Sequence, residues 1–427
     1  MKHTAVLSGE GTPTELPIIE GTVGANGYDI RGLLNATGNV TYDMGFANTA
    51  SCQSKITYID GDKGVLRYRG YPIEQLAESS TFLETAYLVI YGELPSAAEL
   101  SDFEDRIRHK TIIDEGMRKF FETFPRGSHP MPVLAAGVQA LGTFSNASVD
   151  DDPQSIEKAT ERLLAKMPTL AAYGYKNSRG EPALYPDNSL SYVQNFERMS
   201  FGYPTEPYHF EPEITRALDV LLILHADHEQ NCSTSTVRLV GSSGASIYAS
   251  ISAGVNALSG PLHGGANQAV LEMLEQIRTS GISVKDYVQQ VKDRKAGIKL
   301  MGFGHRIYKN HDPRAEIIKK HADRVLALKS GRRDLLDIAQ ELEQAALADD
   351  YFVERRLYPN VDFYSGLIYE AMGFPKEMFT VLFAIGRLPG WIAQWREQRT
   401  DPSRKIGRPR QIYTGVPERD YVGMDDR

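Results

Sequence analysis

The sequence predicts a mainly α-helical fold preceded by a small β-rich module, and three observations lead to this prediction. Beyond residue 70, apolar residues recur at the 3.6-residue period of a helix, as at Phe103 and Ile107. Ser96 and Glu99 form one of two capping-box patterns that mark helix starts. Strand-like runs, by contrast, are almost confined to the N-terminal part of the chain, so we expect an all-α body.

The β-rich module is predicted from short extended stretches and a hairpin pattern. Stretches near residues 18–23 and 28–33 lie in a segment rich in Gly and Thr. The β-prone residues 56–59 and 65–68 flank a turn with the sequence DGDKG, which is typical of a hairpin. We therefore expect a β-rich domain over residues 1–60.

The helical body is predicted from a series of segments with helical periodicity. They fall near residues 155–166, 213–226, 266–278, 314–329, 334–348, 363–372 and 376–396. Residues 233–259 are rich in Ser, Ala and Gly, whose small side chains let buried helices approach closely. This composition predicts a central, buried helix over that range.

Composition restricts the class of protein. A chain of 427 residues is longer than one typical core, so we expect two or three domains. Its only cysteines, Cys52 and Cys232, form neither a disulfide framework nor a Cys-based metal site, which predicts a reducing compartment. The first ten residues lack a secretory pattern, and the strongest apolar run, Val220–Leu224, is far shorter than the roughly 20 residues of a membrane span. We expect a soluble, cytoplasmic protein.

The charge distribution argues against nucleic acid as the main partner and would allow binding of a small anion. The net charge of -8 argues against a nucleic-acid backbone as the main partner. Basic residues nevertheless concentrate near the C-terminus, at Arg387, Arg396, Arg399, Arg404, Lys405, Arg408 and Arg410. Such a cluster can bind a small, multiply charged anion, but a solvated helix face explains it equally well.

Two histidines, His225 and His228, follow an apolar helix. Their spacing of three residues places both imidazoles near one helix face, as a metal pair requires. The order of the HExxH motif is absent, however, and no third ligand is evident. Structural hydrogen bonding or recognition of an anion is therefore the favoured interpretation.

His263 lies in a loop that leads into a predicted helix. Gly264 and Gly265 follow it and allow the backbone to approach a ligand closely. The positive end of a helix dipole disfavours imidazolium, so we expect a neutral imidazole that can donate a hydrogen bond to a forming enolate oxygen. An ordinary loop histidine beside a Gly-Gly turn is the alternative.

Residues 302–314 read GFGHRIYKNHDPR and contain the most informative pattern. The glycines on either side of Phe303 predict a turn that presents His305, and Pro313 fits the first position of a helix. His305 and Arg314 could converge on one carbonyl-bearing carboxylate. The mixture of basic residues and glycines over 295–309 also suits a phosphate-bearing ligand.

Asp362 precedes an apolar helix and has two interpretations. An aspartate at this position is most often an N-cap, and hydrogen bonds from helix amides would lower its pKa and weaken it as a base. Catalysis by Asp362 is the alternative, and its local sequence alone does not favour it.

Together these segments resemble the citrate synthase family, in matching order and spacing over roughly residues 50–420. The matching stretches are HADHE at 225–229, PLHGGAN at 261–267, GFGHRIYKNHDPR at 302–314, VDFYSG at 361–366 and RPRQIY at 408–413. The resemblance implies a large helical domain (61–265 and 373–427) and a small helical domain (266–372). The small domain closes over the substrates and excludes water. Residues 1–60 are then the β-rich N-terminal domain.

The resemblance also implies a mechanism for joining acetyl-CoA to oxaloacetate. Asp362 removes a proton from the acetyl methyl group, and His263 donates a hydrogen bond to the thioester oxygen and stabilises the enol or enolate. His305 polarises the oxaloacetate carbonyl and protonates the alkoxide of citryl-CoA, which is then hydrolysed. No metal and no cofactor take part, since acetyl-CoA is a substrate.

Substrate binding follows from the same resemblance. His228, Arg314 and Arg387 hold oxaloacetate, and Arg408 completes the carboxylate clamp from a neighbouring subunit. Lys309 occupies a position that contacts CoA phosphate in relatives.

The N-terminal module resembles that of larger bacterial members, which form hexamers from dimers. Many of these are inhibited by NADH, and Arg108, Arg162 and Lys166 stand where basic residues line that site. Ser145 and Thr205, however, replace the Tyr and Cys of NADH-sensitive relatives, so we expect no regulation by NADH.

Three alternatives remain open from the sequence. A 2-methylcitrate synthase using propionyl-CoA has the same catalytic residues, although shorter members of that kind usually lack the N-terminal module. A metal-dependent hydrolase would use His225, His228 and Glu229. A non-catalytic helical assembly protein leaves the glycine-flanked histidines without explanation.

Overall fold

The computed structural model describes residues 3–9, 13–145, 152–295, 297–328 and 333–427. Within them the chain forms eighteen α-helices and six short strands, which confirms the predicted mainly α fold. Two compact units are present: Met1–Gln53 together with Ile406–Arg427, and Ser54–Lys405. Among the described helices, none combines the length and the apolar character that a membrane crossing requires.

The first unit contains N-terminal β structure that matches the predicted extended stretches only in part, since residues 20–23 and 29–32 form no strand. Its antiparallel strands are β1 (Thr4–Leu7), β2 (Thr14–Ile19) and β3 (Gly27–Tyr28), followed by the short helix α1 (Leu33–Thr37). Leu16 and Leu33 are buried, whereas the described residues of the C-terminal segment of this unit are exposed.

The predicted hairpin forms but belongs to the second unit. Its strands are β4 (Thr57–Asp60) and β5 (Val65–Tyr68), with β6 (Tyr71–Pro72) paired to β5. The domain boundary predicted at residue 60 falls inside this hairpin, whereas the compact units part after Gln53. The hairpin stays with the helices because Leu66 and Tyr68 are fully buried in their core. The boundaries predicted at 265/266 and 372/373 lie within one compact unit and stay predictions.

The helices of the second unit follow in chain order. The first ten are α2 (Ile73–Ser79), α3 (Phe82–Tyr91), α4 (Ala97–Arg108), α5 (Glu115–Glu122), α6 (Pro130–Phe144), α7 (Pro153–Arg179), α8 (Tyr192–Phe201), α9 (Pro212–His225), α10 (Cys232–Ser242) and α11 (Ile247–Leu258). The rest are α12 (Ala266–Ser280), α13 (Val284–Lys292), α14 (Pro313–Leu328), α15 (Arg333–Leu347), α16 (Asp350–Glu354), α17 (Val361–Met372) and α18 (Phe379–Thr400). Ser96 and Glu99 form the predicted capping box at α4.

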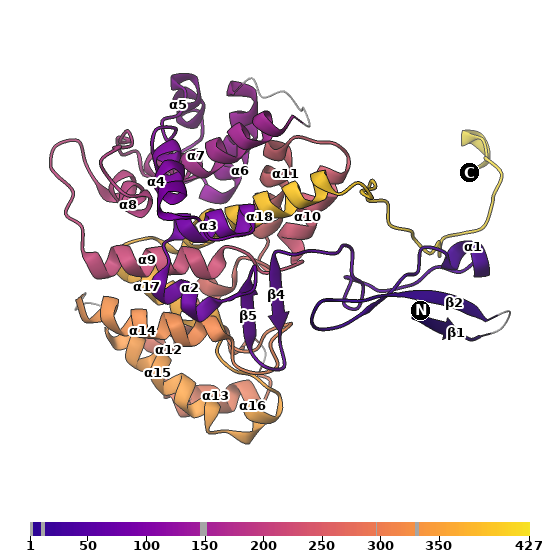
Figure 1. Ribbon diagram of the computed structural model, residues 1–427. Coiled ribbons are helices and arrows are strands. Elements are labelled where there is room, and N and C mark those ends of the chain that lie inside the picture. The colour runs from indigo at the N-terminus through magenta and orange to yellow at the C-terminus, as the bar shows by residue number, and fades with distance from the viewer. Residues whose placement is uncertain (1–2, 10–12, 146–151, 296, 329–332) are drawn as a thin grey trace. The chain divides into compact units, whose positions relative to one another are not determined.

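Helix α18 forms the centre of this unit. It is buried from Phe379 to Trp395, and it contacts α3, α7, α9, α10 and α11, as Figure 1 shows for α3 and α10. A helix that is apolar all round must be enclosed by other elements. The backbone N–H of Gly390, next to Pro389, donates to the carbonyl of Ala226 at 2.9 Å. A Cβ on Gly390 would lie 2.3 Å from that oxygen, so glycine is required where α18 meets the end of α9.

The small-residue stretch 233–259 differs from the single helix that its composition suggests. It forms two packed helices, α10 and α11, because Gly244 adopts a left-handed conformation and Ser246 caps the start of α11. The expected close approach is present: a Cβ on Gly254 would lie 2.6 Å from Val237.

Candidate active site

Several histidines singled out in the sequence lie close to one another or to Phe383 of α18. The imidazole rings of His228 and His305 lie 5.3 Å apart, centre to centre. The ring of Phe383 on α18 contacts both His225, at 4.6 Å, and His263, at 6.3 Å. Segments that are far apart in sequence thus enclose one region.

His225, the last residue of α9, and His228 contact different partners and form no metal pair. His225 Nδ1 lies 2.6 Å from the carbonyl of Leu221, and burial lowers its pKa to about 3. His228 Nε2 instead lies 3.3 Å from the hydroxyl of Tyr308. Glu229 is exposed, and in the described part of the chain no three His, Cys, Asp or Glu side chains are arranged to hold a metal. Hydrogen bonding or anion recognition is therefore the better interpretation of this pair.

His263 is held by the N-terminus of α10 rather than by that of α12. The backbone N–H of Ser233, the second residue of α10, donates to His263 Nε2 at 3.2 Å, and the Ser233 hydroxyl lies 2.9 Å from the same nitrogen. Trp391 Nε1 donates to that hydroxyl at 3.2 Å. Burial, with Arg387 nearby, lowers the pKa of His263 to about 4. The imidazole is therefore neutral with its proton on Nδ1, which leaves Nδ1–H to donate.

The glycines after His263 serve the packing of the loop rather than a ligand. A Cβ on Gly264 would lie 2.4 Å from the carbonyl oxygen of Leu258, and the carbonyl of Gly264 accepts a hydrogen bond from Thr380 at 3.0 Å. A Cβ on Gly265 would lie 3.1 Å from Pro261. The close approach predicted for these glycines is thus to other residues of the protein and not to a ligand.

His305 is fixed through its other ring nitrogen. The backbone N–H groups of Ile307 and Tyr308 donate to His305 Nδ1 at 3.0 and 3.2 Å. Burial first, and Arg314 second, lower the pKa of His305 to about 4. The neutral imidazole therefore has its proton on Nε2.

The predicted turn before His305 pairs with the segment that precedes Asp362. Gly302 and Gly304 have φ values of 77° and 78°, a conformation that favours glycine. Gly304 N–H donates to the carbonyl of Tyr358 at 2.8 Å, and Asn360 N–H donates to that of Gly302 at 2.9 Å. The Asn360 side chain also donates to the carbonyl of Gly304 at 2.9 Å. These bonds bring the loop of His305 and the start of α17 together.

Asp362 is not the N-cap that its local sequence suggests. Asn360 caps α17, because its Oδ1 accepts a hydrogen bond from the backbone N–H of Asp362 at 3.0 Å. In the described residues nothing donates a hydrogen bond to the half-buried Asp362 carboxylate. Burial raises its pKa to about 6, although Arg314 and Arg387 oppose the shift. A carboxylate with this pKa is a better base than an exposed aspartate.

The two buried arginines differ in how their charge is balanced. Arg314 forms a two-point ion pair with Asp312, from Nε at 2.9 Å and from Nη2 at 2.8 Å. Asp312 also accepts the backbone N–H of Val361 at 3.2 Å, which ties α14 to α17. Sequence reasoning missed Asp312 as a partner, although it stands two residues from Arg314.

Arg387 is the less satisfied of the two. Its Nε donates to the carbonyl of His225 at 2.7 Å, but among the described residues its buried Nη1 has no hydrogen-bond partner. Burial lowers its pKa to about 10, while Asp227 acts in the opposite direction. An unsatisfied buried donor costs roughly 1–3 kcal/mol, more when charged. An anionic ligand oxygen at Nη1 would remove this cost.

Two further predicted residues lie on the surface. Lys309 is exposed, and its Nζ donates to the carbonyl of Arg306 at 3.2 Å. Arg408 is exposed and belongs to the first compact unit. Their parts in binding CoA and oxaloacetate stay predictions.

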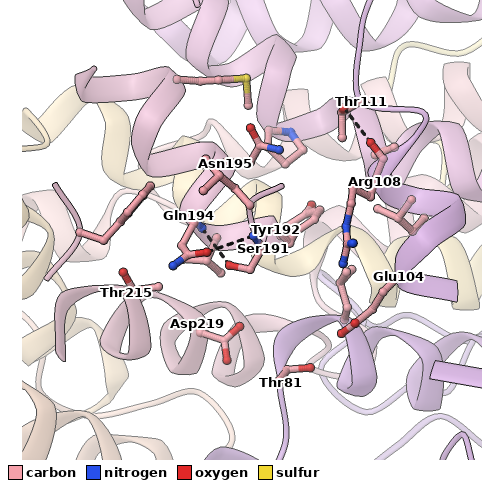
Figure 2. Close-up of a pocket in the computed structure, with 18 of the residues that line it drawn as sticks. Thr81, Glu104, Arg108, Thr111, Ser191, Tyr192, Gln194, Asn195, Thr215 and Asp219 are labelled. Atoms are coloured by element: carbon pink, nitrogen blue, oxygen red, sulfur yellow. Dashed lines mark hydrogen bonds between the residues drawn. The ribbon is translucent and has the colours of Figure 1, made fainter. Parts of the chain in front are cut away.

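A cavity of about 420 Å³ opens among α4, α7, α8 and α9. Figure 2 shows Glu104 and Arg108 of α4 along one wall, and Thr215 and Asp219 of α9 along another. None of the predicted catalytic or oxaloacetate-binding residues lines this cavity.

Residues 45–410 match the sequence model of the family described as citrate synthase, C-terminal domain. The chain is 62% identical over 425 residues to citrate synthase 1 of Mycobacterium tuberculosis, covering 99% of each protein. It is 56% identical over 427 residues to citrate synthase of Corynebacterium glutamicum, covering 100% of this chain and 98% of the relative.

Solved structures give the same result. Citrate synthase from Pyrobaculum aerophilum superimposes with a TM-score of 0.82 at 37% identity, covering 90% of this chain and 95% of that one. Citrate synthase from Thermoplasma acidophilum, in a ternary complex with carboxymethyl coenzyme A and oxaloacetate, gives a TM-score of 0.81 at 31% identity. It covers 89% of this chain and 98% of the other.

Proposed function

The chain belongs to the citrate synthase family, and from this premise we propose that it condenses acetyl-CoA with oxaloacetate and water to give citrate and CoA. The enzyme is an acyltransferase of the citrate (Si)-synthase class. The observation that carries the proposed mechanism is the state of three side chains. The carboxylate of Asp362 does not cap its helix. His263 and His305 are neutral, with the proton on Nδ1 of His263 and on Nε2 of His305.

Asp362 is the proposed base. The methyl protons of a thioester are weakly acidic, so the base needs a pKa near the working pH and help at the thioester oxygen. Burial raises the pKa of Asp362 to about 6, which leaves it mostly ionised at neutral pH. Its carboxylate receives no hydrogen bond from the described residues, so it can accept the methyl proton.

His263 supplies the help at the thioester oxygen. Because Nε2 accepts from Ser233, Nδ1–H is the donor that faces a ligand. A neutral donor stabilises an enol or enolate without protonating the substrate beforehand, since the pKa of the imidazole is lowered to about 4.

His305 acts on the second substrate. Its Nε2–H donates to the oxaloacetate carbonyl, and the proton passes to the alkoxide oxygen when the carbon–carbon bond forms. The ring then carries negative charge, which the backbone N–H groups of Ile307 and Tyr308 stabilise at Nδ1. Hydrolysis of the resulting citryl-CoA releases citrate and CoA.

The carboxylates of oxaloacetate are bound by Arg387, Arg314 and His228 in this proposal. The unpartnered Nη1 of Arg387 supports it most directly, because that donor is buried and aimed at no protein acceptor in the described chain. Arg408 of a neighbouring subunit completes the clamp, and Lys309 contacts the phosphates of CoA.

The test is release of CoA thiol that depends on oxaloacetate. Asp362→Asn keeps the size of the side chain and removes the base, so kcat should fall at least ~10²-fold with little change in oxaloacetate binding. Near-normal turnover would refute the role of Asp362. A higher kcat/KM with propionyl-CoA than with acetyl-CoA would instead favour 2-methylcitrate synthesis, and full activity after chelation would exclude a metal-dependent reaction.

Assembly, location and regulation extend the proposal. We propose a cytoplasmic homo-oligomer, built from dimers and hexameric, that needs no resident cofactor. Ser145 and Thr205 stand where NADH-sensitive relatives carry Tyr and Cys, which supports insensitivity to NADH even though Arg108, Arg162 and Lys166 are present. Sedimentation of the full chain tests the hexamer, and turnover with added NADH tests the lack of inhibition.

A further inference from the structure

We propose that Tyr308 is a positioning residue, which fixes the protonation pattern of His228 and thereby aims an N–H donor at oxaloacetate. The inference rests on the proposed function, because it concerns how that substrate is held. The sequence motifs assign no separate role to Tyr308.

Tyr308 lies at the junction of three site residues. Its ring is 4.8 Å from that of His305 and 5.6 Å from that of His228, and the guanidinium carbon of Arg314 lies 5.8 Å from the ring centre. Only 2% of the residue is exposed. Its backbone N–H is one of the two donors to His305 Nδ1. A displacement of Tyr308 would therefore disturb His305, His228 and Arg314 together.

The hydroxyl of Tyr308 has one partner in the described part of the chain, Nε2 of His228 at 3.3 Å. Burial raises the pKa of this phenol, which keeps its proton in place. If His228 Nε2–H donated instead, the hydroxyl oxygen would accept that bond, but the buried O–H of Tyr308 would be left without an acceptor among the described residues. The proton therefore points at His228 Nε2, and that nitrogen is an acceptor.

The acceptor role of Nε2 decides what His228 can offer to a ligand. The imidazole is neutral, since burial, together with Arg314 and His305, lowers the pKa of His228 far below its usual value. A neutral imidazole has one N–H, and with Nε2 accepting it must be Nδ1–H. Nδ1 has no hydrogen-bond partner among the described residues, so this donor is available. The opposite tautomer would present a lone pair to a dianionic substrate.

Tyr308→Phe removes the hydroxyl and retains both the ring and the backbone N–H to His305. We expect the KM for oxaloacetate to rise roughly 10- to 150-fold, as for loss of a hydrogen bond to a charged group. The KM for acetyl-CoA and kcat should each change less than about threefold. Tyr287→Phe is the matched control, because Tyr287 is also buried and its hydroxyl donates to a backbone carbonyl, that of Lys299 at 2.9 Å. It should leave the KM for oxaloacetate unchanged.

Two further measurements separate positioning from a general loss of structure. In a His228→Asn background, Tyr308→Phe should add less than about twofold to the KM for oxaloacetate, because the residues act as one unit. Nitrogen-15 spectra of labelled His228 in the full chain should show Nδ1 protonated in the wild type. In Tyr308→Phe the Nε2–H form should become populated.

The outcomes distinguish the two proposals. An unchanged KM for oxaloacetate in an active Tyr308→Phe enzyme overturns the positioning role, as does a wild-type spectrum with the proton on Nε2. A fully additive double variant does the same. Absence of oxaloacetate-dependent turnover in the wild type would instead overturn the proposed function, while the spectra still report whether Tyr308 sets the tautomer.

Discussion

The loops that hold His263 and His305 offer two solutions to one problem. Each loop precedes a helix, contains glycines and presents a half-buried imidazole whose pKa is lowered to about 4. In the first loop a hydrogen bond from Ser233 of another helix occupies Nε2, whereas in the second loop two backbone N–H groups of the loop itself occupy Nδ1. Backbone amides thus select the tautomer in both places, and they select opposite ones.

Asn and Gln substitutions at His263 and His305 test the two assigned tautomers, and we expect them to change kcat the most. The amide nitrogen of Asn mimics Nδ1 of histidine, and that of Gln mimics Nε2. We therefore expect His263→Asn to retain more kcat than His263→Gln, and His305→Gln to retain more than His305→Asn. The mismatched amides should cost about 10²–10³-fold, as for loss of an oxyanion donor, and the matched ones roughly tenfold less. The same preferred amide at both positions, measured by thiol release, would contradict the assigned tautomers.

Glycine-to-alanine substitutions compare how tightly the two loops pack, through the free energy of unfolding. Gly302 has a φ of 77°, and a Cβ there would lie 2.6 Å from Val270 and 2.9 Å from Phe363. Gly302→Ala should lower the free energy of unfolding by about 2–4 kcal/mol, since backbone strain and overpacking add. Gly260→Ala is the control, because its nearest neighbour would be 3.6 Å away. Equal denaturation midpoints for the two variants would show that the loops are equally tolerant.

The pH dependence tests whether both imidazoles stay neutral while Asp362 works as a base. A raised pKa of about 6 means that Asp362 is protonated, and inactive as a base, as the pH falls through 6. We expect kcat/KM to drop about fivefold between pH 6 and pH 5, with a slope that approaches one below the pKa. The slope should steepen only toward pH 4, where the lowered pKa values of His263 and His305 lie. A slope that approaches two already between pH 6 and pH 5 would place an imidazole ionisation there.

Ser233→Ala is expected to have the smallest effect. The variant loses the hydroxyl that lies between Trp391 and His263 but retains the backbone N–H that selects the tautomer. We expect kcat to fall only about two- to fivefold, as for one neutral hydrogen bond of about 0.5–1 kcal/mol. A loss above 10²-fold would mean that the hydroxyl, not the amide, controls His263. Ser250→Ala, a buried serine whose hydroxyl bonds within its own helix α11, is the control.

Local patterns predicted the elements better than the contacts between them. The helical period, the capping box at Ser96 and the hairpin were read correctly because each depends on neighbouring residues. The boundary predicted at residue 60 would divide the hairpin, whereas Tyr68 is buried in the helical core through contacts with residues far along the chain. The break at Gly244 between α10 and α11 was also missed.

In the site, too, the residues were predicted better than the contacts they make. The positions of His263 and His305 were predicted from their glycine-flanked loops, but their partner atoms were not. Ser233 lies 30 residues from His263, and no local pattern connects the two. Asp362 looked like a cap because the sequence does not reveal that Asn360, two residues earlier, takes that place. Its freedom to act as a base follows only from the folded chain.

The pairing between the turn at 302–304 and the strand-like residues 358–360 has a consequence for redesign. Phe303 and Pro359 form a β-bridge, flanked by the hydrogen bonds of Gly304 and Asn360. An insertion or deletion in either partner would shift the electrophile and the base out of register, even with every catalytic residue intact. Substrate range is therefore best altered by exchanging side chains at fixed loop length, or by transplanting both segments as one cassette.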